Sequence, residues 1–351
     1  MAVLIFIIIL AVLIFVHELG HFLAARATGI QVEEFAIGFP PKIISYLKNG
    51  TRYCINLFPL GGYVKLLGEM GESRDHNAFV NKPVGSRLLV VVAGVLMNVI
   101  LAVILLTIGF MIGMVPMQLN PADLGGEQTP QVYAVEVIDG SAAAKAGVRQ
   151  GDQIVGFESS SVISVEEVQE YTKSHSGQSV NINIKRDNQE VVIPTQLGKS
   201  DSPLGVYLTQ VSSVRLPLDR AFLASVKETW LGIKAVFEFV VVLFKDIFST
   251  GNISEGVTGP VGIYNVTKQA AKLGVSFVLQ LAAVISLNLA VINFIPFPGL
   301  DGGRGLFIIL EGVLRRKVVR ERVEQTIHMI GFVLLLLFIV AITAKDIVRL
   351  R

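Results

Sequence analysis

Four long apolar stretches constrain this sequence more than any other feature. They run over residues 2–25, 88–115, 275–297 and 327–344, and each approaches the roughly 20 apolar residues that a helix needs to cross a bilayer. Charged residues make up only 17% of the 351-residue chain, against about 25% in a typical soluble domain. The sequence therefore predicts four transmembrane helices. It excludes a disordered chain and disfavours an ordinary soluble globule.

The first apolar stretch has an alternative interpretation as a secretory signal peptide. A signal peptide has a basic segment before its apolar run and a small-residue cleavage site after it, and this stretch has neither. It also contains His17, Glu18 and His21, where a signal peptide is purely apolar. A transmembrane helix therefore fits the stretch better.

A fifth apolar stretch, residues 231–248, carries charges at near-helical spacing. Lys234, Glu238 and Lys245 recur on one face, which is typical of an amphipathic helix at the membrane surface. We expect this segment to lie in the interface or against the other helices, and not to span the bilayer.

Lys and Arg in the short loops predict the orientation, because they favour the cytoplasmic side of a membrane. The loop after the first stretch contains eight of them, and the loop before the last stretch contains six, including Lys317 and Arg320. Both loops are therefore expected in the cytoplasm. The long segment from about 118 to 274 and both chain ends are then expected outside.

Residues 131–210 change to the pattern of a small folded domain. Alternating apolar residues predict strands near 133–137, 153–157 and 180–184. Ser164 with Glu167 forms a capping box, which predicts that a helix begins there. Short strands and helices in this order indicate an α+β module.

The order of these elements, with Ala-Gly-Val-Arg-Gln-Gly-Asp-Gln-Ile at 146–154, resembles a circularly permuted bacterial PDZ domain. Another small αβ module is the alternative. The resemblance implies that Leu204, Gly205 and Val206 form the loop that receives a peptide end. PDZ domains bind peptides by adding a strand to a sheet edge.

His17-Glu18-Leu19-Gly20-His21 is an H-E-x-x-H motif inside the first apolar stretch. On a helix, both imidazoles lie on one face and can reach one metal ion, and Glu18 beside them can take a proton from water. Zinc lowers the pKa of a water that it binds to about 7. Ionisable groups at membrane depth need a partner or a wet cavity, so the motif predicts a zinc site. The alternative is a polar cluster that packs helices together.

Such a site needs a third protein ligand and an open position for water. No His follows at the spacing of a metzincin, and the acidic pair at 33–34 lies beyond the apolar stretch. The better candidate is Asp301, which follows two prolines near the end of the third apolar stretch. Prolines end helices, and irregular backbone at membrane depth lines a cavity or is buried. We therefore expect Asp301 on irregular chain, near the depth of His17 and His21.

H-E-x-x-H at 17–21 and N-x-x-P-x-P-x-L-D-G at 293–302 together resemble the motifs of the site-2 protease family, and most closely its bacterial RseP-like members, here with a single PDZ domain. The resemblance covers nearly the whole chain. It implies that the two histidines and Asp301 bind Zn²⁺ and that Glu18 is the catalytic base. The family's Gly-Pro-x-x-Asn pattern in the second span is present only in part, because Val95 replaces the proline.

Two further segments are candidates for substrate binding. Residues 58–65 resemble the family's membrane re-entrant β-hairpin, whose edge pairs with substrate, and this implies contacts from the Gly61-Gly62-Tyr63 segment. Asn293 and Asn288 in the third apolar stretch are candidates to donate hydrogen bonds to the substrate backbone. The alternative for both asparagines is a hydrogen bond between helices.

The expected fold is a multi-pass α-helical membrane protein with four transmembrane helices, a re-entrant β-hairpin and an inserted extracytoplasmic PDZ (α+β) domain. The expected segments are transmembrane helix 1 (1–25), a cytoplasmic loop with the hairpin (26–87), transmembrane helix 2 (88–117), the PDZ-like domain (118–213), an extracytoplasmic membrane-associated amphipathic segment (214–274), transmembrane helix 3 (275–303), a cytoplasmic loop (304–326) and transmembrane helix 4 (327–346).

The resemblance implies an intramembrane zinc metalloendopeptidase that hydrolyses peptide bonds in or near transmembrane segments, for example of anti-sigma factors or signal-peptide remnants. It implies a place in the bacterial inner membrane, with the active site near the cytoplasmic side. The expected partners are transmembrane protein or peptide substrates and the lipid bilayer. No nucleic acid is expected as a partner, because the net charge is only +2. No nucleotide cofactor is expected either. The alternative is a non-catalytic membrane scaffold that binds peptides through the PDZ-like domain.

Overall fold

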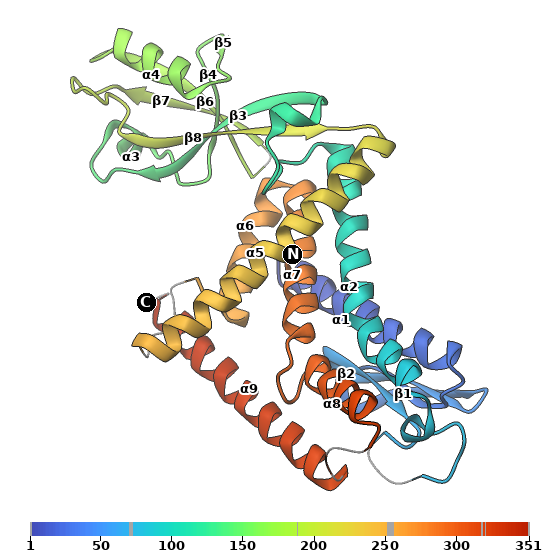
Figure 1. The fold of residues 1–351 in the computed structure, drawn as a ribbon. Coiled ribbons are helices and arrows are strands. Elements are labelled where there is room, and N and C mark those ends of the chain that lie inside the picture. Colours follow the sequence, from blue (N-terminus) through green and yellow to red (C-terminus); the bar gives the residue numbers. More distant parts are fainter. Residues whose placement is uncertain are drawn as a thin grey trace. The chain divides into compact units, whose positions relative to one another are not determined.

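The computed structural model describes residues 2–69, 73–187, 189–250, 256–316, 319 and 321–349 (Figure 1). Lys317 and Arg320, two of the cations used to predict the orientation, lie outside these residues. The chain divides into two compact units. Unit 1 comprises Met1–Leu105, Thr229–Lys268 and Leu281–Arg351, and unit 2 comprises Leu106–Glu228 and Gln269–Gln280.

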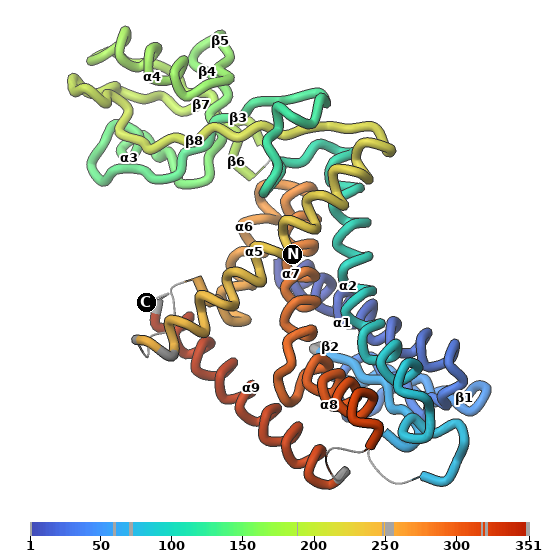
Figure 2. Tube along the Cα trace, viewed as in Figure 1, coloured from blue at the N-terminus to red at the C-terminus, as the bar shows by residue number. Residues whose placement is uncertain are grey.

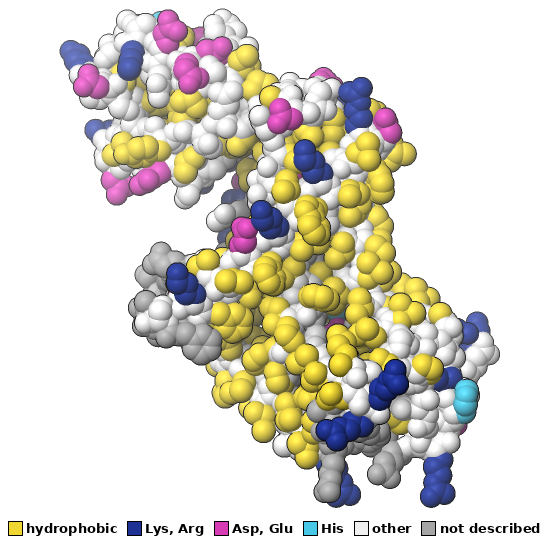
Figure 3. Space-filling model, in the orientation of Figure 1, with side chains coloured by type: hydrophobic (Ala, Val, Ile, Leu, Met, Phe, Trp, Pro, Cys, Tyr) yellow, Lys and Arg dark blue, Asp and Glu magenta, His cyan; other side chains and the backbone are white. Residues whose placement is uncertain are grey.

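Among the described residues, four helices are long and apolar enough to cross a membrane, in agreement with the sequence. They are α1 (Ala2–Ala27), α2 (Val84–Ile112), α7 (Val275–Phe294) and α9 (Glu321–Arg349, apolar over Arg322–Val348). Much of their apolar surface stays exposed, as in α9, where Leu337 is 60% and Val340 is 65% accessible. Figure 3 shows such side chains as a broad yellow surface over the helices of unit 1. An exposed apolar surface of this extent is consistent with a membrane protein.

Helix α5 (Leu218–Thr250) is longer than the amphipathic helix expected over 231–248, and it does not qualify as a membrane span among the described helices. Helix α6 (Pro260–Leu273) follows it in the chain. Asp346 of α9 is 7% exposed and accepts hydrogen bonds from the backbone N–H groups of Gly259 and Gly262, at 3.0 and 2.9 Å. A carboxylate at this position satisfies the otherwise unpaired N–H groups at the start of α6.

The sequence predicted that Asp301 lies on irregular chain. This prediction is wrong, because Asp301 is the first residue of helix α8 (Asp301–Leu314). Only residues 295–300, between α7 and α8, are irregular. Two prolines fall within this short segment and keep it out of a helix, and helical structure resumes once the prolines have passed. Much of the loop expected over 304–326 is therefore helical. Figures 1 and 2 both show α8 beside α1 and the hairpin that follows α1.

This hairpin consists of two long, bent strands, β1 (Val32–Lys48) and β2 (Thr51–Leu66), and is larger than the segment expected at 58–65. Its turn is Asn49-Gly50, with φ of 52° and 79°, the positive values that favour Asn-Gly in tight hairpins. Because both strands bend, Glu34 pairs with Arg52 as well as with Lys65. The hairpin thus forms a small sheet in which its last segment, residues 62–66, pairs with only one described neighbour.

Unit 2 contains a six-stranded sheet with the order β7-β6-β4-β3-β8, to which β5 adds beside β4. Its elements are β3 (Glu127–Val137), α3 (Ala142–Ala146), β4 (Gln153–Phe157), β5 (Ser160–Ser161), α4 (Val165–Ser174), β6 (Ser179–Arg186), β7 (Gln189–Gln196) and β8 (Val206–Arg215). The expected strands and the helix after Ser164 are all present. The N–H of Glu167 donates to Oγ of Ser164 at 3.1 Å, but the Glu167 carboxylate reaches the N–H of Ile163 and not that of Ser164.

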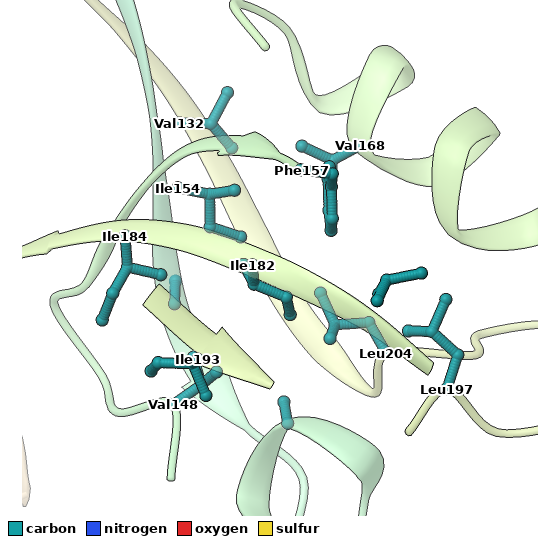
Figure 4. Close-up of a cluster of buried hydrophobic side chains, with 13 residues drawn as sticks. Val132, Val148, Ile154, Phe157, Val168, Ile182, Ile184, Ile193, Leu197 and Leu204 are labelled. Atoms are coloured by element: carbon teal, nitrogen blue, oxygen red, sulfur yellow. The ribbon is translucent and has the colours of Figure 1, made fainter. Parts of the chain in front are cut away.

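The core of unit 2 lies between this sheet and its two helices. Figure 4 shows the buried side chains pointing toward one another, with Ile154 and Ile182 from central strands and Val168 from α4. A second buried cluster, in unit 1, joins α1 to the hairpin and to α2, with Phe22 and Phe35 at its centre. The second cluster attaches the hairpin to the helix that carries the H-E-x-x-H motif.

Candidate metal centre

His17 and His21 lie one turn apart on α1, and their side chains point at the same place. Their Nε2 atoms are 3.2 Å apart. Oδ2 of Asp301, at the start of α8, lies 3.0 Å from Nε2 of His17 and 3.3 Å from Nε2 of His21. The three side chains are only 12%, 13% and 24% exposed. The fold therefore brings together two residues and a third that follows them by about 280 positions.

Helix α2 supports the two rings. Nδ1 of His21 lies 2.8 Å from the carbonyl oxygen of Val90, so this nitrogen carries a proton, and in the neutral imidazole Nε2 then has a free lone pair. Gly94, one turn further along α2, leaves room for both rings. A methyl group at Gly94 would clash with Nε2 of His21 and lie 2.8 Å from Cε1 of His17. Only glycine permits so close an approach.

Asn98 contacts the other nitrogen of His17. Its Nδ2 lies 3.3 Å from Nδ1 of His17, and its Oδ1 is buried without a hydrogen-bond partner among the described residues. Rotating the amide by 180° exchanges these two atoms. Oδ1 then accepts a hydrogen bond from Nδ1–H of His17, which satisfies the buried oxygen and leaves Nε2 of His17 unprotonated. Both imidazoles then present a lone pair toward Asp301.

Glu18 lies next to this cluster and faces the hairpin. Its carboxylate forms no hydrogen bond with the described part of the chain. A methyl group on Gly62 of β2 would lie 3.2 Å from Cγ of Glu18, so the edge segment 62–66 passes close to this side chain. A free carboxylate thus lies between two histidines and the edge of a sheet.

A cavity of about 520 Å³ opens beside Asp301. It is lined by residues of α8 and α9 and by Glu69, Phe79 and Arg87. His328 of α9 also lines it, and the Nδ1 atom of His328 accepts a hydrogen bond from the N–H of Gly299 at 3.0 Å. No local motif predicted that His328 would hold the segment just before Asp301.

The residues expected to bind substrate lie in two places, on helix α7 and in the hairpin. Asn288 and Asn293 are partly buried on α7, and neither amide hydrogen-bonds to another described residue. Gly61 has φ of +136°, and an added methyl group would clash with the ring of Phe39. The Tyr63 hydroxyl donates to Oε1 of Glu34 at 2.5 Å, so it is engaged within the hairpin.

The Tyr63 hydroxyl is hard to ionise. Burial, followed by the hydrogen bond to Glu34, raises the pKa of Tyr63 to about 12. Burial alone would also raise the pKa of Glu34, but hydrogen bonds from Lys42 and Tyr63 hold it below its ordinary value. The pair is therefore a hydroxyl donor and an ionised carboxylate at neutral pH.

Leu204, Gly205 and Val206 belong to unit 2. Leu204 is buried, and its carbonyl accepts a hydrogen bond from the N–H of Ala143. Gly205 has φ of +72°, and an added methyl group would clash with Cβ of Ser141. This turn leads directly into β8, which is one of the two edge strands in the order β7-β6-β4-β3-β8.

His17, His21 and Asp301 surround one point and could hold a metal ion, and the Glu18 carboxylate lies beside them. A metallopeptidase needs the same kinds of side chain. The helices that carry this site place it in a membrane-protein fold. The chain belongs to peptidase family M50, the site-2 protease family, whose model matches residues 5–338. The family expected from the sequence motifs is thereby confirmed.

Individual relatives agree with this assignment. A Clostridium perfringens protein named "Putative zinc metalloprotease" is 34% identical, over 96% of this chain and 95% of its own length. A protein named zinc metalloprotease RasP from Geobacillus kaustophilus is 28% identical, over 97% of this chain and 96% of its own length. The RasP protein of Bacillus licheniformis is 29% identical, over 98% of each chain.

Proposed function

We propose that this chain is an intramembrane zinc endopeptidase in which His17, His21 and Asp301 hold the metal and Glu18 is the catalytic base. Membership of a peptidase family and relatives named zinc metalloproteases make it a zinc-dependent protease. The observation that carries the residue assignment is the convergence of three ligand atoms, 3.0–3.3 Å apart, beside a free carboxylate.

The donor atoms fit zinc in type and spacing. Zinc binds imidazole nitrogen and carboxylate oxygen at about 2.0–2.2 Å in tetrahedral geometry, which puts neighbouring ligand atoms about 3.3 Å apart. The three separations here are 3.0, 3.2 and 3.3 Å. Three protein ligands leave the fourth position for water, as in catalytic and not in structural zinc sites.

Glu18 supplies the proton transfers. Its carboxylate has no competing hydrogen bond, so it is free to take a proton from the attacking water and to pass it to the leaving amine. When bound, zinc would activate that water and polarise the carbonyl under attack. The two imidazoles stay fixed because Val90 and Asn98 contact the ring nitrogens that face away from the cluster.

We propose that substrate is held as an added strand along residues 62–65. A peptide bond inside a helix is shielded by its own hydrogen bonds, so the substrate has to unwind before it is cut. The edge segment passes Glu18, and Gly62 allows a close approach of backbone. The unengaged amides of Asn288 and Asn293 support a role in hydrogen bonding to the substrate backbone, in place of the alternative role between helices.

For unit 2 we propose a PDZ-like, peptide-binding role outside the cytoplasm. The glycine turn at 204–206 opens the edge strand β8, and α4 contacts β8. Val206, Leu208 and Val168 contribute apolar side chains on this side of the core. These features support binding of a peptide end as an extra strand.

We further propose the bacterial inner membrane as the location, with the zinc site toward the cytoplasm. The substrates are then membrane proteins or peptides cut in or near their transmembrane segments, including anti-sigma factors and signal-peptide remnants. The four apolar helices and the position of the ligands on α1 and α8 support this setting.

The test is cleavage of a single-span membrane protein by purified wild type and Glu18→Gln. The substitution keeps the shape of the side chain and removes the base, so kcat should fall about 10²–10⁴-fold while bound zinc is unchanged. Wild-type cleavage by Glu18→Gln would remove Glu18 from the mechanism. A wild type that holds no zinc and cuts no substrate would favour the non-catalytic scaffold.

A further inference from the structure

Glu69 connects the edge of the hairpin sheet to the helix that carries Asp301. Its Oε2 accepts a hydrogen bond from the N–H of Leu66, the last residue of β2, at 3.1 Å. Its Oε1 forms an ion pair with Nη1 of Arg304 on α8. Glu69 is only 12% and Arg304 31% exposed. We call this contact the Glu69–Arg304 bridge.

The two ends of the bridge lie close to the two parts of the proposed reaction centre. Arg304 follows Asp301 by three residues, so both side chains emerge on the same side of α8. Leu66 is four residues beyond Gly62, which lies against Glu18. The bridge therefore joins the proposed substrate strand to the proposed metal ligand at a fixed position along that strand.

We propose that Glu69 and Arg304 are positioning residues that set which substrate peptide bond lies at the metal centre. This inference rests on the proposed function, because it needs substrate to pair with residues 62–65, next to the Leu66 that Glu69 holds. A strand advances about 3.3 Å per residue, and a shift by two residues restores the same pairing and the same side-chain faces. If the edge of the hairpin were not held in place, the substrate could shift by two residues. The metal centre would then meet several alternative peptide bonds and not a single one.

The chain offers a matched control for a purely stabilising ion pair. Glu311, also on α8, receives two hydrogen bonds from Arg87 of α2, at 2.8 and 2.9 Å. The side chains of Arg87 and Glu311 are 8% and 25% exposed, so this pair is buried to a degree similar to that of the bridge. It connects α8 to α2. Loss of this pair should weaken the fold without moving the substrate strand.

The experiment compares wild type with Glu69→Gln, Arg304→Gln, the double variant, Arg304→Lys and Glu311→Gln. Each full-length protein digests a single-span membrane protein, and mass spectrometry identifies the bond that is cut. Glutamine at 69 still accepts from the N–H of Leu66, so only the ion pair is lost. Bound zinc is measured on every variant, because a positioning role leaves zinc unchanged.

We expect Glu69→Gln and Arg304→Gln to cut the wild-type bond and bonds two residues from it, with kcat/KM about tenfold lower. The double variant should be no worse than either single one, because both remove the same interaction. Arg304→Lys should restore the single cut, and Glu311→Gln should keep it.

Wild-type cut position and kcat/KM in both Gln variants would overturn the inference while leaving the proposed function intact. Equal loss of cut-site fidelity in Glu311→Gln, or loss of zinc in the bridge variants, would also overturn it, since either result indicates a general structural effect. A wild type that cuts nothing would instead refute the proposed function.

Discussion

At the scale of single residues, the candidate centre depends on space as much as on ligands. Gly94 makes the two imidazoles fit against α2, because any side chain at this position would push them away from Asp301. The nearest equivalent on the same helix is Gly85, where an added methyl group would have no neighbour within 4 Å. The two glycines therefore separate the effect of crowding from the effect of helix propensity.

Gly94→Ala should weaken zinc binding about tenfold or more. The added methyl group would displace the imidazoles and their supporting contacts, and the loss of such contacts typically lowers metal affinity 10–100-fold. Gly85→Ala should bind zinc like the wild type. The measurement is the zinc that each purified protein retains in a series of competing chelator concentrations. Equal zinc retention by both variants would contradict the packing role of Gly94.

The sequence predicted His17, Glu18, His21 and Asp301 because each belongs to a motif with a chemical meaning. It gave no role to Asn98, although Asn98 follows Gly94 by one helical turn and so lies on the same face of α2. The carbonyl of Val90 and the side chains of Glu69 and Arg304 act through tertiary contacts. No spacing within the chain encodes such contacts.

At the scale of elements, the turn of the hairpin has a clear signal in the sequence. Asn49-Gly50, between alternating apolar residues, is a strong hairpin signal and marks the turn of β1 and β2. The prolines before Asp301 correctly predicted the end of α7. They did not predict that α8 begins at Asp301 itself, because restarting a helix depends on packing. Added methyl groups at Gly302 and Gly303 would clash with the carbonyls of the 295–300 segment.

In unit 2, a buried ion pair stabilises the turn before β4. Asp152 is 2% exposed and accepts two hydrogen bonds from Arg186 of β6, at 2.8 and 2.6 Å. The Arg186 guanidinium also donates to the carbonyl of Gly147 at 2.7 Å. The hydrogen bond to Asp152 raises the pKa of Arg186 above its already high value. The guanidinium is thus charged at any pH at which the domain is folded.

Arg186→Met should destabilise unit 2 by about 3 kcal/mol, because it leaves the Asp152 carboxylate buried and without its cation. The control is Lys272→Met, which removes an ion pair with Asp187 whose side chains are 54% and 53% exposed. That loss should be below about 1 kcal/mol. Hydrogen exchange of the backbone amides of β4 and β6 in the full-length protein measures the destabilisation that each variant causes. Equal protection in the two variants would contradict the larger loss expected for Arg186→Met.

At the scale of the whole molecule, the proposed orientation places residues 118–274 outside the cytoplasm and the 304–326 segment inside. Alkaline phosphatase, which is active only outside the cytoplasm, should be active when fused after Lys199 and inactive when fused after Arg316. The reverse pattern would mean that the loop cations do not set the orientation. It would also place the zinc site toward the outer face.

In the proposed function, α1 and α8 hold one zinc ion between them. This is tested by measuring the zinc content of wild type and Asp301→Ala, together with X-ray absorption at the zinc edge. Two imidazole nitrogens and one carboxylate oxygen should surround one zinc ion per chain, and Asp301→Ala should lose most of it. Asp301→Ala that retains one zinc ion per chain in an unchanged coordination shell would contradict the convergence of α1 and α8 on a single metal.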